Sequence, residues 1–277
     1  MPDISHHAPA GDATGTPLIR ISHASKSFAQ AHGGRVDAIK DVSLDIAEGD
    51  IFGLAGGSGA GKSTLLRLIN VLERADSGTV TVAGREMTQL GKRELRAARQ
   101  NIGMVFQQCA LLHHATVYDN VAFPLRLRGT LNAPRLAARV HECLALADLA
   151  DHAGSYPAQL SAGERQRTAV ARALASRPAV LLYDAPTCAL DADTACSLLA
   201  MLRDVNLRLG VTIVIASDEP SLLGALCKRV AVIEDGAVAE QFALADTSSP
   251  RKTALGRELA WYGVEASAAA WQGAAHV

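Results

Sequence analysis

Short apolar runs alternate along the chain with longer stretches in which apolar residues recur every three or four positions. The runs have the length of buried strands, and the stretches between them have helical periodicity. This alternation is typical of an α/β fold with a largely parallel sheet. The predicted strands are residues 18–21, 42–46, 51–55, 102–105, 180–183, 211–215 and 229–233.

A segment from about residue 110 to 165 interrupts this alternation. Between residues 136 and 149, apolar side chains are spaced as on one face of a helix, and strand signals are few. We therefore predict a helical subdomain inserted into one α/β domain that spans residues 17–246. Residues 1–16 are predicted to be a disordered tail, and residues 247–277 a short C-terminal extension and tail.

Composition excludes several classes of function. The 27 Lys and Arg nearly balance the 28 Asp and Glu, so no field attracts nucleic acid or anionic lipid. The five cysteines are odd in number and form no C-x-x-C pair, which argues against a disulfide framework or a zinc site. His6 and His7 lie in the predicted tail and are interpreted as part of it, not as a metal site. No apolar run reaches the roughly 18 residues that span a bilayer, and no secretion signal is evident. We expect an intracellular protein that contacts a membrane only through a protein partner.

A glycine-rich loop follows the strand at 51–55 and precedes a helical run. It fits G-x-x-x-x-G-K-[ST], in which backbone N–H groups and the helix N-terminus face phosphate oxygens. The lysine reaches the β and γ phosphates of ATP and the serine hydroxyl binds Mg²⁺. A plain glycine turn before a helix is the alternative. The predicted nucleotide-binding residues are Gly56, Gly57, Ser58, Gly59, Ala60, Gly61, Lys62, Ser63 and Thr64.

An acidic residue ends the apolar strand at 180–183. Asp184 is predicted to be the second protein ligand of Mg²⁺, with a turn residue or helix cap as the alternative.

Three further strings resemble motifs of one family. Residues 160–167 (LSAGERQR), 105–108 (VFQQ) and 189–191 (ALD) look like the signature motif, the Q-loop and the D-loop of ATP-binding cassette ATPases. Over about residues 18–259 the chain most closely resembles the ATPase subunits of methionine importers. The resemblance implies a P-loop NTPase-type core with an antiparallel β subdomain besides the helical insertion.

The resemblance also implies roles for single residues. Two cassettes would close head to tail, so that Ser161 and Gly163 meet the γ-phosphate of the partner's ATP at the start of a helix over 164–176. Glu164, in the same motif, stands where the family usually has glutamine, as Ala162 does for glycine, so this half-site is expected to be usable but weaker. Ser161 as an ordinary N-cap with Glu164 three residues on is a compatible alternative.

Two other nucleotide contacts follow from the same resemblance. Phe28 matches the aromatic residue that stacks on adenine, and Gln107 matches the residue that senses Mg²⁺ and the γ-phosphate. A core phenylalanine is the alternative for the first.

Two positions depart from the family pattern. Ala185 stands where the family has the glutamate that orients or deprotonates the attacking water, and Asp218 stands where it has the switch histidine. We expect a hydrolytic half-site that binds ATP and cleaves it poorly or not at all. The alternative is that Glu219 or Asp191 serves as the base.

Partners are implied by the resemblance as well. They are transporter membrane subunits, a second cassette ATPase that is identical or different, and indirectly a solute-binding protein, at the cytoplasmic face of the inner membrane. Helices carrying Tyr118, Asn120 and Phe123 are expected to line the groove for the membrane subunit. The ligand-sensing domain common in this family is expected to be missing, and with it feedback inhibition by methionine. The alternatives are a nucleotide-dependent switch outside transport and a lipoprotein-release exporter subunit.

Overall fold

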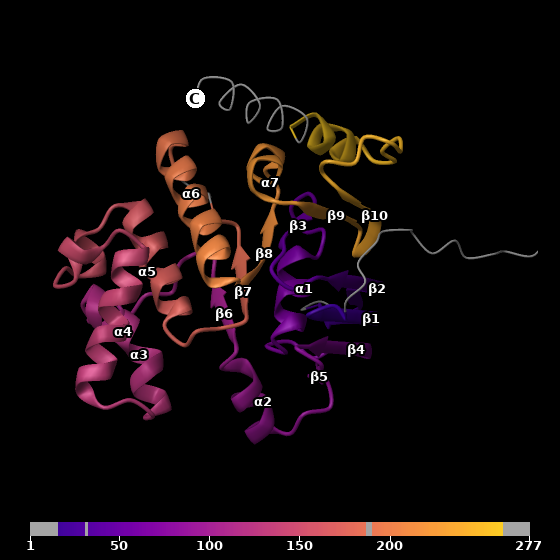
Figure 1. The fold of residues 1–277 in the computed structure, drawn as a ribbon. Helices are drawn as coiled ribbons and strands as arrows, with labels where there is room; N and C mark the ends of the chain where they lie inside the picture. Colours follow the sequence, from indigo (N-terminus) through magenta and orange to yellow (C-terminus); the bar gives the residue numbers. More distant parts are fainter. Residues whose placement is uncertain (1–15, 31–32, 187–189, 263–277) are drawn as a thin grey trace, which may run out of the picture.

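The computed structural model describes residues 16–30, 33–186 and 190–262. A six-stranded sheet with the strand order β10-β9-β3-β8-β7-β6 forms its centre (Figure 1). Neighbouring strands from β9 to β6 are parallel, and β10 is antiparallel to β9, which confirms the largely parallel sheet. The strands are β3 (Ile51–Ala55), β6 (Ile102–Val105), β7 (Val180–Asp184), β8 (Thr212–Ser217), β9 (Arg229–Glu234) and β10 (Ala237–Ala243).

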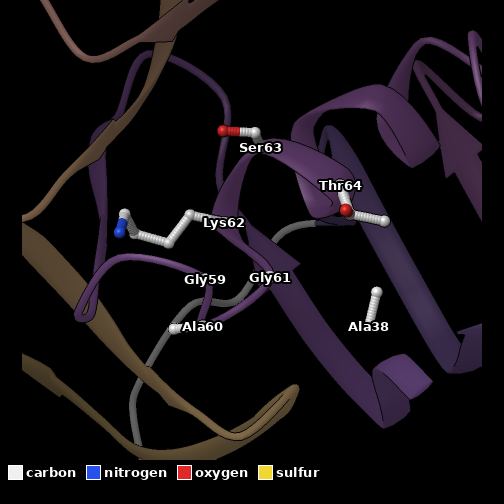
Figure 2. Close-up of a pocket in the computed structure, with 7 residues that line it drawn as sticks. All are labelled: Ala38, Gly59, Ala60, Gly61, Lys62, Ser63 and Thr64. Carbon is white, nitrogen blue, oxygen red and sulfur yellow. The ribbon is translucent and has the colours of Figure 1, made fainter. Parts of the chain in front are cut away.

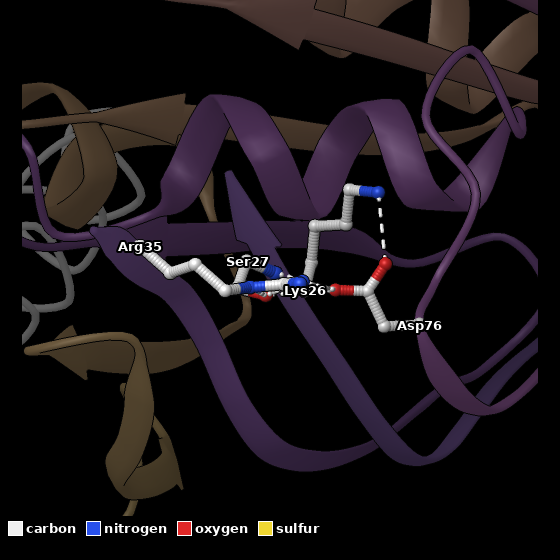
Figure 3. A network of polar contacts seen from close by, with 4 residues as sticks. All are labelled: Lys26, Ser27, Arg35 and Asp76. Carbon is white, nitrogen blue, oxygen red and sulfur yellow. Dashed lines mark hydrogen bonds and ion pairs between the residues drawn. The ribbon is translucent and has the colours of Figure 1, made fainter. Parts of the chain in front are cut away.

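A second, antiparallel sheet has the order β2-β1-β4-β5 and is the expected antiparallel subdomain. Its strands are β1 (Ile19–Ala29), β2 (Arg35–Ile46), β4 (Ser77–Val82) and β5 (Arg85–Glu86). Asp76, just before β4, joins this strand to β1 and β2 through polar contacts, as Figure 3 shows. Its carboxylate accepts from the backbone N–H and hydroxyl of Ser27 and forms ion pairs with Lys26 and Arg35.

The central sheet separates two apolar cores, because successive residues of a strand point to opposite faces. In β7, Leu181 and Tyr183 belong to the core shared with α5 (Ala162–Leu174), α6 (Ala192–Leu209) and α7 (Pro220–Leu226). Val180 and Leu182 belong to the other core. That core also holds α1 (Lys62–Ile69), α2 (Lys92–Arg99) and the inner face of the antiparallel sheet. Burial on both faces explains the continuous apolar runs of the sequence.

The predicted helical insertion contains α3 (Val117–Arg128) and α4 (Ala133–Leu146), followed by 3₁₀ turns at Ala150–His152 and Pro157–Gln159. Figure 1 shows these helices on the opposite side of the central sheet from β1 and β2. Asn120 is fully buried, and its amide bonds the backbone of Leu112, Ala115 and Thr116. The Asn120 side chain thus holds the preceding loop, and the expectation that the helices carrying it line a groove for the membrane subunit stays a prediction.

The described chain ends in a helical stretch at 254–262, in which Leu259 is buried in the core beneath α7. Within the described residues no helix is both long and apolar enough to cross a bilayer. The predicted disordered tails fall almost wholly on residues 1–15 and 263–277, which lie outside the described part, so they and the domain bounds stay predictions.

Candidate functional site

The glycine-rich loop leaves the carboxyl end of β3 and enters α1. Gly61 precedes the helix with a φ of 107°, in the left-handed region where a side chain is strained. A Cβ on Gly61 would lie 2.4 Å from the carbonyl oxygen of Ala38, and one on Gly56 equally close to that of Ile233. The loop thus needs glycine at both ends, because the backbones of β2 and β9 press against it.

Residues 59–64 of the loop and Ala38 of β2 line a cavity of about 160 Å³ (Figure 2). The ammonium group of Lys62 donates to the carbonyl oxygens of Gly56 and Gly57, at 2.7 and 2.8 Å. Burial lowers the pKa of Lys62, and the charges of Asp218 and Asp184 oppose that shift. A lysine held by carbonyls at a helix N-terminus suits a polyphosphate, whose oxygens would be better acceptors than the loop.

Ser63 and Asp184, two of the residues predicted from sequence to bind Mg²⁺, are in contact. The hydroxyl of Ser63 donates to a carboxylate oxygen of Asp184 at 2.8 Å, although 121 positions separate them. Asp184 is buried at the end of β7. Among the residues that the structure describes, no group of three or more His, Cys, Asp and Glu could hold a metal. Two hard oxygen ligands fit Mg²⁺, which keeps water and phosphate oxygens as its other ligands.

The two degenerate positions lie at the same edge of the sheet. Asp184 pairs with Ala216 of β8, and the backbone N–H of Ala185 donates to the carbonyl of Ala216 at 2.8 Å. Ala185 has a φ of 47°, a conformation that costs a residue with a side chain roughly 1 to 2 kcal/mol. Asp218 follows β8, is exposed, and is near enough to Lys62 for its charge to act on the pKa of the lysine. Both positions therefore follow the carboxyl ends of neighbouring strands, and the anion of Asp218 acts on Lys62 of the phosphate loop.

The carboxylates of the two alternative bases each accept hydrogen bonds at the start of a helix. The carboxylate of Asp191 is the N-cap of α6 and accepts from the backbone N–H and hydroxyl of Thr194, at 3.0 and 2.8 Å. These bonds lower the pKa of Asp191 and make it a weaker base. Glu219 precedes α7 and accepts from the hydroxyl of Ser221 at 3.2 Å.

The signature string begins α5. The Ser161 hydroxyl accepts from the backbone N–H of Glu164, and the Glu164 carboxylate accepts from the backbone N–H of Ser161. This capping box lowers the pKa of Glu164, whose other oxygen pairs with His152 at 3.2 Å. The helix starts at Ala162, two residues earlier than predicted, because the cap is Ser161 itself.

The signature and the phosphate loop belong to different parts of the fold. α5 packs against α3, α4, α6 and β6, whereas α1 packs against β2, β4, β7 and β8. Figure 1 shows α5 beside α6, apart from α1. In the described chain the signature string and the phosphate loop therefore lie apart.

The two other predicted nucleotide contacts, Phe28 and Gln107, come from β1 and from the segment after β6. Phe28 is half-buried on β1, pairs with Val36 of β2, and its ring centroid is 5.3 Å from the ammonium of Lys26. Gln107 is exposed just beyond β6, whose last residue pairs with Tyr183 of β7. Gln107 and Ala185 thus follow the carboxyl ends of neighbouring strands.

Sequence reasoning missed three residues that lie against the phosphate loop or the signature string. Ala38 lines the loop cavity, and Gly236 donates its N–H to the carbonyl of Ala60 at 3.1 Å. A Cβ added to Gly163 would lie only 2.3 Å from the side-chain methyl carbon of Thr194. Only the Asp235-Gly236 dipeptide, a common hairpin turn, carries a local signal.

The family model described as ABC transporter matches residues 39–188. The methionine import ATP-binding protein MetN 2 of Yersinia pestis (strain Antiqua) is 47% identical over 242 residues, which are 87% of this chain and 73% of that protein. MetN of Symbiobacterium thermophilum is 49% identical over 224 residues, 81% of this chain and 67% of its own.

Solved structures have the same fold. The dimeric post-hydrolysis structure of the ATP-binding cassette MJ0796, bound to ADP and Pi, has a TM-score of 0.76 and 33% identity, covering 83% of this chain and all of that one. CbiO1 of Clostridium perfringens, described as part of the complex cbiONQ, has a TM-score of 0.75 and 26% identity.

Proposed function

Because the chain belongs to the ABC transporter family, we propose that it is the ATP-binding subunit of a methionine importer. The observation that carries the proposal is the 47% identity over 87% of the chain to a methionine import ATP-binding protein. Such a subunit works at the cytoplasmic face of the inner membrane, bound to the membrane subunits and through them to a solute-binding protein. Its substrate would be selected by those partners.

The phosphate loop is proposed to hold Mg-ATP. Lys62 exchanges its two carbonyl partners for phosphate oxygens, and the N–H groups at the start of α1 bind further oxygens. Ser63 and Asp184 supply the protein ligands of Mg²⁺, which neutralises phosphate charge when bound. Phe28 stacks on the adenine, and Gln107 orients water near the metal.

The second half-site is proposed to serve a partner cassette. Ser161 and the N–H of Gly163, at the positive end of α5, meet the γ-phosphate of nucleotide bound by the partner. The separation of α5 from α1 within this chain supports a two-chain site. The solved relative MJ0796 is itself dimeric.

The chain's own hydrolytic half-site is proposed to be impaired. The Ala185 methyl group cannot accept a proton, and the loss of a positioned base lowers the rate by about 10² to 10⁴. Asp218 adds negative charge where charge develops on the γ-phosphate, at a further cost of about 10². The two losses serve one step and are not additive. The cap bonds of Asp191 argue against its use as a substitute base.

Pairing with a competent cassette is a second proposal, favoured by what the chain retains. Lys62, Ser63, Asp184 and the signature Ser161 are present, whereas the two residues specific to cleavage are replaced. The chain would lend its signature to the partner's ATP while its own site holds nucleotide as a clamp. If the purified chain forms only homodimers and no second cassette co-purifies with its transporter, this pairing is refuted.

Docking on a membrane subunit is supported by α3. Phe123 and Leu127, four residues apart on that helix, are 43% and 73% exposed. Exposed apolar residues at this spacing offer a surface for a partner helix.

Methionine uptake tests the proposed function. The chain, its membrane subunits and any co-purifying cassette are reconstituted in liposomes that enclose ATP, and uptake of labelled methionine from a loaded solute-binding protein on the outside is followed across the bilayer. We expect uptake that the Lys62→Ala variant abolishes. Nucleotide binding without methionine transport would favour the switch or the exporter.

A further inference from the structure

A second cavity lies far from the phosphate loop. It measures about 620 Å³, within the range of small-molecule sites, and is formed by α3, α4 and the turn after α5. Asn101, which precedes β6, forms part of its wall. The cavity is thus at the amino ends of the parallel strands, whereas the phosphate loop is at their carboxyl ends.

Its wall is strongly basic in a chain whose net charge is −1. The charged residues that line it are four arginines and one glutamate: Arg128, Arg135, Arg139, Arg177 and Glu142.

Part of this charge caps α5. Arg139 is buried and donates to the carbonyl oxygens of Leu174 and Ala175, at 2.6 and 3.1 Å. Its remaining nitrogen pairs with Glu142 at 2.8 Å. Cations at a helix C-terminus are favourable, so Arg139 and Glu142 are explained by the fold itself.

The guanidinium groups of the other three arginines keep hydrogen-bond donors that the described part of the fold does not satisfy. Arg128 donates through one terminal nitrogen to the carbonyl of Ser176, but its Nε is buried without a hydrogen-bond partner. Arg135 has no ion pair or hydrogen bond from its guanidinium within the described residues. Arg177 reaches Glu142 only at 3.5 Å and is 74% exposed.

The backbone at Arg177 adds a second observation. Its φ of 53° lies in the left-handed region, which glycine or asparagine adopts more readily. Arg177, which lines the cavity, therefore adopts its backbone conformation at a cost. Buried donors without partners are uncommon in proteins and are satisfied by a ligand or an ordered water.

We propose that this arginine pocket, lined by Arg128, Arg135 and Arg177, binds a small oxyanion with two or more phosphate or carboxylate groups. The planar guanidinium groups form paired hydrogen bonds with either kind of group. A bound anion would join α3 and α4 to the segment between α5 and β7. The ligand would thus stabilise the helical region against the sheet, independently of the proposed transport function.

Calorimetric titration with inorganic pyrophosphate and with citrate tests the pocket and separates phosphate from carboxylate. The full chain is first saturated with Mg-ADP, so that the phosphate loop does not take up the probe. We expect saturable binding of at least one probe, weakened at least about tenfold by Arg135→Glu and by added salt. Nucleotide affinity should stay unchanged in that variant.

Arg93→Glu is the matched control, because Arg93 is an exposed arginine on α2 outside the cavity. It should weaken probe binding by less than about twofold, since screening limits its effect. Absence of saturable binding of both probes overturns the proposal, as does equal weakening by Arg93→Glu and Arg135→Glu. Binding that is lost in Lys62→Ala but kept in Arg135→Glu would also overturn it.

Discussion

Restoring the two cleavage positions should convert a nucleotide-binding subunit into an active ATPase. The double substitution Ala185→Glu/Asp218→His places a carboxylate after β7 and removes the anion after β8. Position 185 should tolerate the longer side chain. Its φ of 47° is already left-handed, so alanine and glutamate bear similar strain, and the bond to Ala216 involves only backbone. The fold and the Ser63–Asp184 contact should persist.

The expected gain in ATPase rate depends on a single chemical step, the cleavage of the γ-phosphate. A positioned base contributes about 10² to 10⁴ in rate, and removing repulsion at the γ-phosphate contributes about 10². Because both act on the same step, the double variant should gain about 10² to 10⁴ rather than the product. The Asp218→His change should also tighten ATP binding, because one negative charge near Lys62 is removed.

Steady-state phosphate release at saturating Mg-ATP measures this gain, with nucleotide binding measured on every variant. Ala185→Gln/Asp218→His is the matched control, since its side chain has the same shape but is not a base. Lys62→Ala in the restored background should abolish both binding and turnover. The reasoning is refuted if the natural chain shows a phosphate burst as fast as the double variant. It is equally refuted if the double variant binds ATP and gains nothing.

Three further predictions concern stability, each read from chemical or acid unfolding. The pKa of Asp76 is lowered from 3.8 to about 2, chiefly by a backbone hydrogen bond, so its contribution is present above pH 3.8 and is lost as the pH falls towards 2. In Asp76→Asn the free energy of unfolding should fall less steeply between pH 3.8 and 2 than in the natural chain. An unchanged pH dependence in this range would contradict the prediction. Gly163→Ala should cost about 1 to 3 kcal/mol, because the new methyl meets Thr194, and Thr194→Ser should recover most of it; no recovery would exclude the clash. Asn120→Ala should lower the free energy of unfolding by about 2 to 3 kcal/mol, because it removes a buried hydrogen-bonding side chain. The control is Asn132→Ala, which removes the exposed N-cap of α4 and should cost about 1 kcal/mol. Equal costs of the two substitutions would argue against the burial of Asn120.

Sequence alone determined the local features of this protein. Apolar runs flanked by turn residues predicted the parallel strands, because strands buried on both faces must be apolar throughout. The conformation of the loop from Gly56 to Ser63 could be predicted from its own residues, since a helix N-terminus preceded by glycines is specified within eight residues. The replacements Ala185 and Asp218 were equally visible, because a chemical role depends on residue type at a motif position.

Beyond the shared Mg²⁺ role that the motifs predicted for Ser63 and Asp184, tertiary structure decided which distant residues touch and how closely. The 2.8 Å bond between Ser63 and Asp184, the contact of Thr194 with Gly163 and the burial of Asn120 depend on packing between separate elements. So does the arginine pocket, whose members come from α3, α4 and the turn after α5. Local periodicity reports which face of an element is apolar, but not which element covers that face. Polar contacts across such interfaces therefore appear only once the chain has packed.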